Sequence, residues 1–554
     1  MQQASNNNKA LTLRNAEQVM RLARMGSFHA SRLSFMRILL RRLQSENWSF
    51  QRSVWRMSDS GEGVAVYQAQ GPERVYSLVA FGHDLPDQMR SDRVIAQAWD
   101  ATFTLFDGVP SEADLERLQA NVPVQEAGRV SESEIALSRA NRSVRLWDHV
   151  VSRLAKGQQP DVAELDSVGY LMRTTAVYGS GKFGAADREV IADRPEFAAP
   201  FQAEMLSVLM IRQFARDWVE HCAQIQGGMQ AVKMDDQLAT RLGIGNSTGL
   251  GMAPFLLNHP VLLNNWILAR ETAIAEVCAL DGVTTNAWAQ VQLLLSRQRA
   301  ELEYWPASHP IIQQRLPRLA QDLAAVEQWM WHNRRDWQAL LDFTQQACEL
   351  EAQELLASLI LEPYPQIDRL ADSMAADEAN LPAIDGSRSI SDTCQQIEQR
   401  YQWALNIDWG SPEAQSHLWY VSEEKLEPRL AIRQEEPLDA YEQPLAPGRD
   451  LAFAYRDLQQ YTGATLAEFL LSHPQHRGAI QRLQWLQTAP YGEIVDNTTG
   501  HGLMPIDLLR CKLSFFGASR FDPRSDRWVR ICMYRNGPYL DQVNQVSDQW
   551  VYGL

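Results

Sequence analysis

The stretches WSFQRSVWRMS (residues 48–58), GVAVYQAQ (63–70), RVYSLVAFGHD (74–84) and TFTLFDG (102–108) follow one another near the start of the chain. They are short runs rich in β-branched and aromatic residues, and the turn signals Ser60-Gly61 and Gly71-Pro72 lie between the first three. This pattern predicts an antiparallel β-meander over residues 47–108. The arginine-rich segment before it, residues 20–43, is typical of a helix.

Beyond the meander, from about Ser131 to Glu362, apolar residues recur with a helical period. Ser131 and Glu134 have the spacing of a capping box, which predicts a helix from there to about Lys156. Further helices are expected over residues 161–178, 200–225, 260–280, 284–304 and 318–360. This block is therefore expected to form a helical, bundle-like unit.

The last third of the chain contains two irregular stretches. Residues 374–391 are small and acidic, and residues 427–450 carry four prolines, so both are typical of linkers or long loops. After them we expect helices over residues 448–487 and strands around CKLSFFG (511–517) and RWVRICMYR (527–535).

Together these patterns predict an α+β fold that is predominantly α-helical, with an N-terminal antiparallel β-meander, a central helical block and a mixed α/β C-terminal part. The chain is divided accordingly into an N-terminal α+β region (1–128), a central helical domain with glycine-rich loops (129–372), a linker with long irregular loops (373–450) and C-terminal helices and strands (451–554).

Composition excludes several classes of protein. With 554 residues, 45% hydrophobic and 22% charged, the chain is neither collagen-like, coiled-coil nor wholly disordered. Its net charge of -16 argues against a general nucleic-acid or anionic-membrane partner. No apolar run reaches the ~18 residues of a membrane span, and the six cysteines form no CxxC pair. We expect a soluble, cytoplasmic protein and leave a homo-oligomer open.

The first candidate site is the glycine-rich stretch RLGIGNSTGLGMAPFLLNHP, residues 241–260. A loop of this kind lets backbone N–H groups converge on an anion, with hydroxyl groups beside them and a helix starting nearby. The residues expected to bind a carboxylate or phosphate are Gly245, Asn246, Ser247, Thr248 and Gly249. The spacing is that of neither a dinucleotide fingerprint nor a P-loop. The alternative is that the glycines permit close packing at a tight connection.

The second candidate site is RTTAVYGSGKFG, residues 173–184. It carries Lys182, and lysine supplies only six of the chain's 52 basic residues. Lysine can serve as a base, a Schiff-base amine or an anion contact. We predict catalytic roles for Lys182 and Tyr178 and anion binding by Arg173. The alternative is a helix C-cap with an exposed lysine on its loop.

His259 adjoins the first glycine-rich stretch and is predicted to carry protons there, with a helix-capping role equally open. The other histidines lack a third ligand at recognisable spacing, so no metal site is predicted. No motif indicates a particular organic cofactor.

If the two glycine-rich stretches face each other, they would form a cationic pocket rich in hydroxyl groups. Such a pocket suits proton abstraction next to a carboxylate, elimination or group transfer. The predicted function is an enzyme acting on a small anionic metabolite, and the class favoured is a metal-independent lyase or another proton-transfer enzyme. Two alternatives stay open: a non-catalytic metabolite-binding or regulatory protein, and a structural or assembly protein with interfaces rich in tryptophan and arginine.

Overall fold

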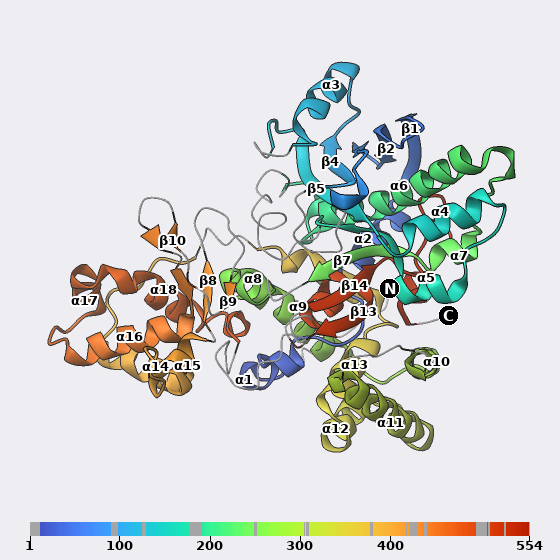
Figure 1. Cartoon of the computed structure of the whole chain (residues 1–554). Coiled ribbons are helices and arrows are strands. Elements are labelled where there is room, and N and C mark those ends of the chain that lie inside the picture. The colour runs from blue at the N-terminus through green and yellow to red at the C-terminus, as the bar shows by residue number, and fades with distance from the viewer. Residues whose placement is uncertain are drawn as a thin grey trace.

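Nine strands form one sheet in the order β1 (Ser49–Met57), β2 (Gly63–Gln70), β3 (Val75–Gly82), β4 (Ala101–Asp107), β5 (Glu134–Arg142), β6 (Tyr170–Thr174), β7 (Gly243–Thr248), β14 (Trp528–Met533) and β13 (Ala518–Ser525) (Figure 1). Neighbouring strands of this sheet are antiparallel except β6 and β7, which are parallel. The fold is α+β and mainly helical, as the sequence predicts.

The computed structural model describes residues 11–89, 98–124, 129–176, 191, 193–248, 252–303, 305, 310–376, 381–416, 418–421, 429–430, 433, 435–436, 440–441, 443–494, 507, 510–525 and 528–552.

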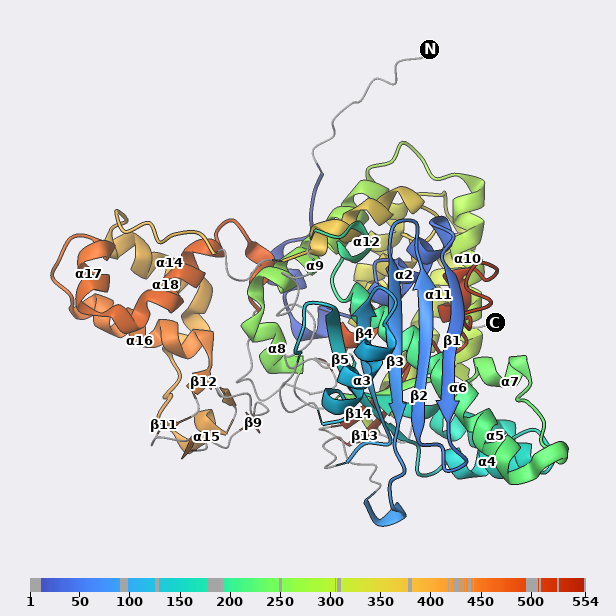
Figure 2. The same cartoon turned by 90° about the horizontal axis from the view of Figure 1, so that it is seen from above.

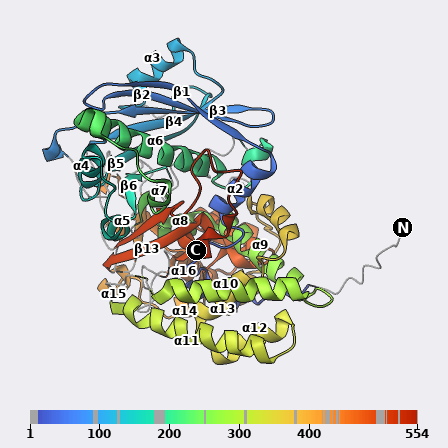
Figure 3. The same ribbon diagram turned by 90° about the vertical axis from the view of Figure 1, so that its right-hand side faces the viewer.

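The predicted meander is confirmed as strands β1 to β4. Because successive side chains of a strand point to opposite faces, Val66 and Tyr67 of β2 enter different apolar layers. Val66 packs in a cluster with Leu115 and Leu118 of α3 (Glu112–Asn121). Tyr67 belongs to the main core. Figure 3 shows α3 and α6 (Gln202–Gly227) on opposite sides of these strands.

The long helix α6 confirms the helix expected over residues 200–225 and packs against the main-core face of the sheet. The ring centroid of Phe214 lies 5.5 Å from that of Phe103 on β4. Beside it, α6 contacts α4 (Trp147–Ala155) and α2 (Phe35–Ser45). The N-terminal helix predicted over residues 20–43 is shorter than expected and is displaced toward the C-terminus, as α2. It is preceded by the single turns α1 (Ala16–Val19) and η1 (Leu22–Arg24).

The prediction of one helix from Ser131 to Lys156 is wrong. Its first half is strand β5, and only its second half is helical, as α4. The capping-box pair exists in another role: Ser131 Oγ donates to Glu134 Oε1 at 3.3 Å, and Glu134 is buried at the start of the strand, where Arg117 pairs with it. Both faces of β5 are covered, so its apolar residues do not show the alternation of a half-buried strand.

The prediction of one helix over residues 161–178 is also wrong. The helix formed there, α5 (Val162–Val168), is terminated by Gly169, which adopts a left-handed conformation (φ +80°). Tyr170 then begins β6.

The remaining central helices agree better with the sequence. The helices expected over 260–280 and 284–304 are α9 (Pro260–Cys278) and α10 (Thr285–Glu303). The helix expected over 318–360 is divided into three helices. Asp336 is the N-cap of the second one and Cys348 is its C-cap. The three are α11 (Pro310–His332), α12 (Trp337–Ala347) and α13 (Leu350–Leu359), and two short helices, α7 (Asp236–Thr240) and α8 (Met252–Asn258), precede α9.

A second hydrophobic core lies between residues 384 and 486 and packs helices α14 (Ile390–Leu405), α16 (Pro447–Gln460), α17 (Leu466–Ser472) and α18 (Arg477–Trp485). Figure 2 shows these helices to one side of the large sheet. Near them are the short helix α15 (Pro412–Gln415) and the short strands β8 (Trp419–Val421), β9 (Arg429–Leu430), β10 (Glu435–Glu436), β11 (Ala440–Tyr441) and β12 (Gln443–Leu445). The four-region division of the chain stays a prediction.

The segment CKLSFFG was expected to be a strand and is not. Residues Lys512–Phe516 form η11, a single π-helical turn, which Gly517 closes in a left-handed conformation (φ +98°) before β13 begins. The strand expected at 527–535 is confirmed as β14. π-Helical turns are rare and are found frequently at functional sites.

The N-terminal segment 23–36 packs against this π-helical turn. Ser31 N–H donates to Ser514 O at 3.1 Å, and Arg510 Nη1 donates to Ala23 O at 2.7 Å. Gly26 approaches the backbone of Arg510 so closely that a Cβ on Gly26 would lie 2.4 Å from the carbonyl carbon of Arg510. Two segments that are almost five hundred residues apart in sequence therefore form one packed unit.

This contact predicts that Gly26→Ala destabilises the protein strongly, because the new methyl group would overlap backbone that cannot rotate away. We expect a loss of about 1–3 kcal/mol of unfolding free energy or more, typical of overpacking, measured by urea denaturation. Gly478→Ala on α18 is the matched control: its Cβ would meet no atom within 4 Å, and alanine is the better helix former. Equal stability of the Gly26→Ala protein and the wild type would contradict the contact.

Candidate functional site

The two glycine-rich stretches of the sequence overlap two adjacent parallel strands, β6 and β7. Arg173 of β6 is the register partner of Gly245 on β7, and the two strands end at Thr174 and Thr248 on the same edge of the sheet. Neighbouring strands lie roughly 5 Å apart, so Arg173 and Gly245 of the two stretches lie side by side. In open α/β sheets built of parallel strands, ligands bind outside the carboxyl ends of the strands.

The structure does not describe all the predicted site residues. Tyr178, Lys182 and Gly249 lie outside the described residues, and their roles stay predictions. Ser247 and Thr248 are placed by their backbone, as register partners of Arg530 and Val529 on β14.

Residues 243–248 are not the loop that the sequence predicts, because this segment is strand β7, hydrogen-bonded to β14 on one side and β6 on the other. Anion binding by Gly245, Asn246, Ser247 and Thr248 stays a prediction. The glycines of β7 serve packing. A Cβ on Gly245 would lie 2.7 Å from the ring of Tyr170, and one on Gly243 would lie 2.3 Å from Met533 O. The alternative interpretation, that glycine allows close approach, explains these two positions.

Asn246, one of the predicted site residues, is buried, and both the nitrogen and the oxygen of its amide group are hydrogen-bonded. Its side chain is 2% exposed, its Nδ2 donates to Thr174 O at 3.1 Å, and its Oδ1 accepts from Lys512 Nζ at 2.9 Å. Because a carbonyl oxygen can only accept and an amine here donates, the two contacts fix the orientation of the amide. Asn246 thus links the end of β6 to the π-helical turn.

Lys512 is 1% exposed, at the first position of that turn. Its Nζ lies 5.6 Å from the centroid of Phe516, and its neighbours Cys511, Leu513 and Phe515 are also buried. Burial disfavours the charged amine and lowers the pKa of Lys512 to about 7, against 10.5 for an ordinary lysine. An ionisable group perturbed in this way indicates a candidate functional residue.

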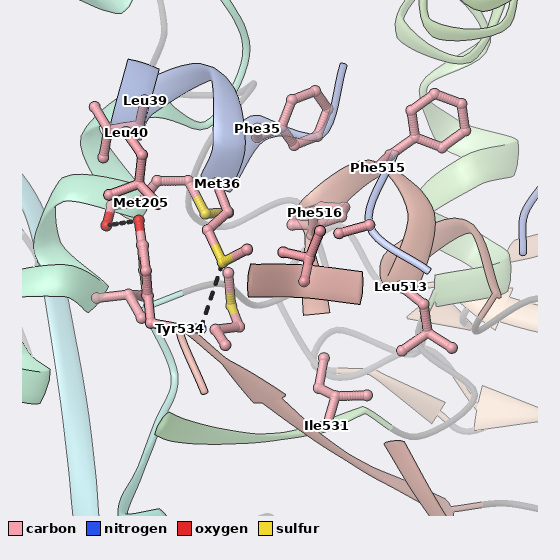
Figure 4. Close-up of a cluster of buried hydrophobic side chains, with 14 of the residues drawn as sticks. Phe35, Met36, Leu39, Leu40, Met205, Leu513, Phe515, Phe516, Ile531 and Tyr534 are labelled. Atoms are coloured by element: carbon pink, nitrogen blue, oxygen red, sulfur yellow. Dashed lines mark hydrogen bonds between the residues drawn. The ribbon is translucent and has the colours of Figure 1, made fainter. Parts of the chain in front are cut away.

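The apolar support of the turn comes from both ends of the chain (Figure 4). The ring centroid of Phe516 lies 5.3 Å from that of Phe35 on α2 and 4.6 Å from that of Phe201. Tyr534 N–H donates to Met36 Sδ at 3.4 Å, and its hydroxyl donates to Met205 O at 2.9 Å. Phe516 of the turn therefore lies among aromatic side chains.

His259 occupies the N-cap of α9, where its Nδ1 lies 2.9 Å from Phe255 O and its ring stacks on that of Phe255. Burial lowers the pKa of His259. Within the described part of the chain its contacts do not reach Lys512 or Asn246. The geometry agrees with a structural role at the helix start, and its catalytic role stays a prediction.

Sequence reasoning selected Lys182 among the lysines and missed Lys512. The available signal was its setting: a lysine between Cys511 and the apolar residues Leu513, Phe515 and Phe516, in a chain that otherwise uses arginine. The pairing with Asn246 joins residues 266 positions apart and has no local signature.

Comparison of the chain with protein-family models, with curated proteins and with solved structures finds no match. Among the described helices, none combines the length and apolar character of a membrane span. In the same residues, no three side chains of His, Cys, Asp or Glu come together in a way that could hold a metal ion.

The lowered pKa of Lys512 predicts a pH-dependent stability. Between pH 7 and 10.5 the unfolded chain binds a proton at this lysine that the folded chain does not, so folding becomes more favourable as the pH rises through this window. The unfolding free energy of the wild type, relative to Lys512→Met, should rise by about 1.4 kcal/mol per pH unit, measured by urea denaturation at pH 7.5, 8.5 and 9.5.

Lys233→Met is the matched control, since Lys233 is exposed, and it should leave the pH dependence of the wild type unchanged. A stability difference between the wild type and Lys512→Met that is constant across these pH values would show that Lys512 keeps an ordinary pKa.

Proposed function

We propose that this protein is an enzyme that binds a small carboxylate- or phosphate-bearing metabolite at the sheet edge where β6 and β7 end, with Lys512 as its proton-transfer group. The observation that carries the proposal is the buried amine of Lys512 held by Asn246 beside the carboxyl ends of two parallel strands. A lysine in such a site costs stability relative to an apolar residue, and sites of this kind often serve chemistry rather than packing.

A base works best when its pKa lies near the working pH, since it is then largely unprotonated yet still basic. With its pKa lowered to about 7, Lys512 meets this requirement. A neutral amine can accept the proton from a carbon atom next to a carboxylate and return it after a bond has broken, which is the chemistry of a lyase. Arg173, half-buried on β6, is the proposed contact for the substrate's negative charge.

The proposed chemistry is tested by hydrogen exchange. In D₂O the wild type should exchange the hydrogen next to the carboxylate of its substrate for deuterium, detected by ¹H NMR across a panel of small carboxylic and phosphorylated acids. Lys512→Met should lower this exchange by about 10²–10⁴-fold, the usual contribution of a general base. Lys233→Met should exchange at the wild-type rate.

Binding is measured in parallel by thermal denaturation with the same panel, because a ligand specific for the folded state raises the melting temperature. Stabilisation without exchange would reject the enzyme and support the binding or regulatory class. An equal response of the wild type and Lys512→Met to every ligand would reject Lys512 as part of the site, and no response to any ligand would reject the site itself.

A further inference from the structure

In the described part of the chain, few contacts join the helices of the second hydrophobic core, between residues 384 and 486, to the body that contains the large sheet. We propose that these helices form one rigid piece, here called the helical unit, which rotates away from that body, and that the side chain of Arg482 holds it closed. Figure 2 shows the unit to one side of the large sheet. The opening needs no substrate and is independent of the proposed chemistry.

The apolar packing of the helical unit is almost wholly internal. Its core is built by α14, α16, α17 and α18, with residues such as Leu451 and Phe469 fully buried among them. From the described part of residues 384–486, the main core includes only Trp419 of β8 and Leu445 of β12. A unit with its own core and a small apolar contact to its neighbour keeps its fold when that contact breaks.

On the unit's side of the joint, the entering and leaving segments of the chain are paired. Asp385 N–H donates to Gln484 Oε1 at 2.8 Å, and Gln484 Nε2 donates to Asp385 O at 3.0 Å. Gln481 Nε2 also donates to Pro382 O at 3.0 Å. The chain therefore enters and leaves the helical unit at one place.

On the other side of the joint, two adjacent residues of α9 hold both connections. Asn265 Nδ2 donates to Ala375 O at 2.6 Å before the unit, and Asn264 Oδ1 accepts from Tyr491 N–H at 3.1 Å after it. Because both connections are anchored side by side, small backbone rotations between the anchored and the paired residues suffice to turn the whole unit.

Arg482 of α18 joins the helical unit to the sheet-containing body. Its Nη1 donates to Leu257 O of α8 at 2.9 Å, and its Nε donates to Glu493 Oε2 at 2.6 Å. Glu493 is 4% exposed and precedes Ile494, a residue of the main core. A buried carboxylate is costly without its cation, so the pair favours the closed arrangement.

The contact of Arg482 is incompletely satisfied in the closed arrangement. Within the described residues, Arg482 Nη2 and Glu493 Oε1 are buried and have no hydrogen-bond partner. Opening returns both atoms to water, where they are hydrogen-bonded, and this gain offsets part of the loss of the two contacts of Arg482. Opening therefore costs less free energy than the unfolding of either core.

Opening also releases the helix that follows β7. α8 begins at Met252, four residues after Thr248 ends β7, so its first residue lies within about 15 Å of that strand end. Arg482 holds Leu257, near the other end of this short helix. The position of the helical unit thus determines how firmly α8 is held beside the sheet edge.

Hydroxyl-radical footprinting of the full-length protein, read by mass spectrometry, tests the opening through Trp419. This side chain is buried against the main core and becomes exposed only when the unit rotates. Arg482→Met should raise its oxidation rate about tenfold, since hydrogen bonds to a charged group are lost. Trp409 of the second core and Trp266 of the main core should keep their wild-type rates, because both bodies stay folded.

Arg477→Met is the matched control, because Arg477 is exposed on the same helix, and it should leave the oxidation of Trp419 unchanged. The double variant Arg482→Met/Glu493→Gln should open no more than Arg482→Met alone, because the two side chains share one contact. Arg482→Lys keeps the charge without the planar fork that reaches both acceptors, so a smaller rise at Trp419 is expected.

An oxidation rate of Trp419 that is the same in Arg482→Met and the wild type would overturn the role of Arg482. A rise shared equally by Trp409 would overturn the rigid opening, because it would show that the unit unfolds. Should Arg482→Met fail to fold, Arg482→Lys decides in the same way: a rise confined to Trp419 supports the opening, and no rise rejects it.

Discussion

The packing of residues 23–36 against the segment 510–517, which contains the π-helical turn, is the constraint on which the central part of this structure depends. It consists of main-chain contacts, such as Ser31 N–H to Ser514 O, and of the close approach of Gly26 to Arg510. Because these contacts join the two ends of the chain, they fix where the last two strands enter the sheet. β14 pairs with β7, and the π-helical turn that precedes β13 places Lys512 Nζ 2.9 Å from Asn246 Oδ1.

The two basic residues of segment 510–517, Arg510 and Lys512, have different electrostatic environments. Arg510 is 2% exposed and pairs with the buried carboxylate of Glu351, so its charge is balanced inside the protein. Lys512, two residues later, donates to the neutral amide of Asn246, and burial shifts its pKa toward the unprotonated form. Arginine keeps its proton at any physiological pH, whereas lysine can lose it. The turn thus places a permanent charge and a titratable amine side by side, with different partners for each.

The sequence was informative where local patterns determine structure. Alternating runs with turn signals predicted the meander, and long helical periods predicted α6, α9 and α10. It failed at β5 and β6, where a strand covered on both faces has no alternation and where Gly169 ends a helix early. Asn246 was predicted as a site residue for its amide, and it does meet a perturbed lysine, but in a strand rather than a loop. Lys512 was missed because its partner lies far along the chain.

The position of the candidate site follows from topology. In an antiparallel pair, the carboxyl end of one strand lies beside the amino end of the next, and a short hairpin joins them. A parallel pair needs a long crossover, and here the crossover includes α6 and joins β6 to β7. It brings two carboxyl ends together. β14 pairs antiparallel with β7, and Lys512 of the π-helical turn that precedes β13 donates to Asn246 of β7. A site at this place therefore needs residues from three distant segments, which is why no single motif of the chain describes it.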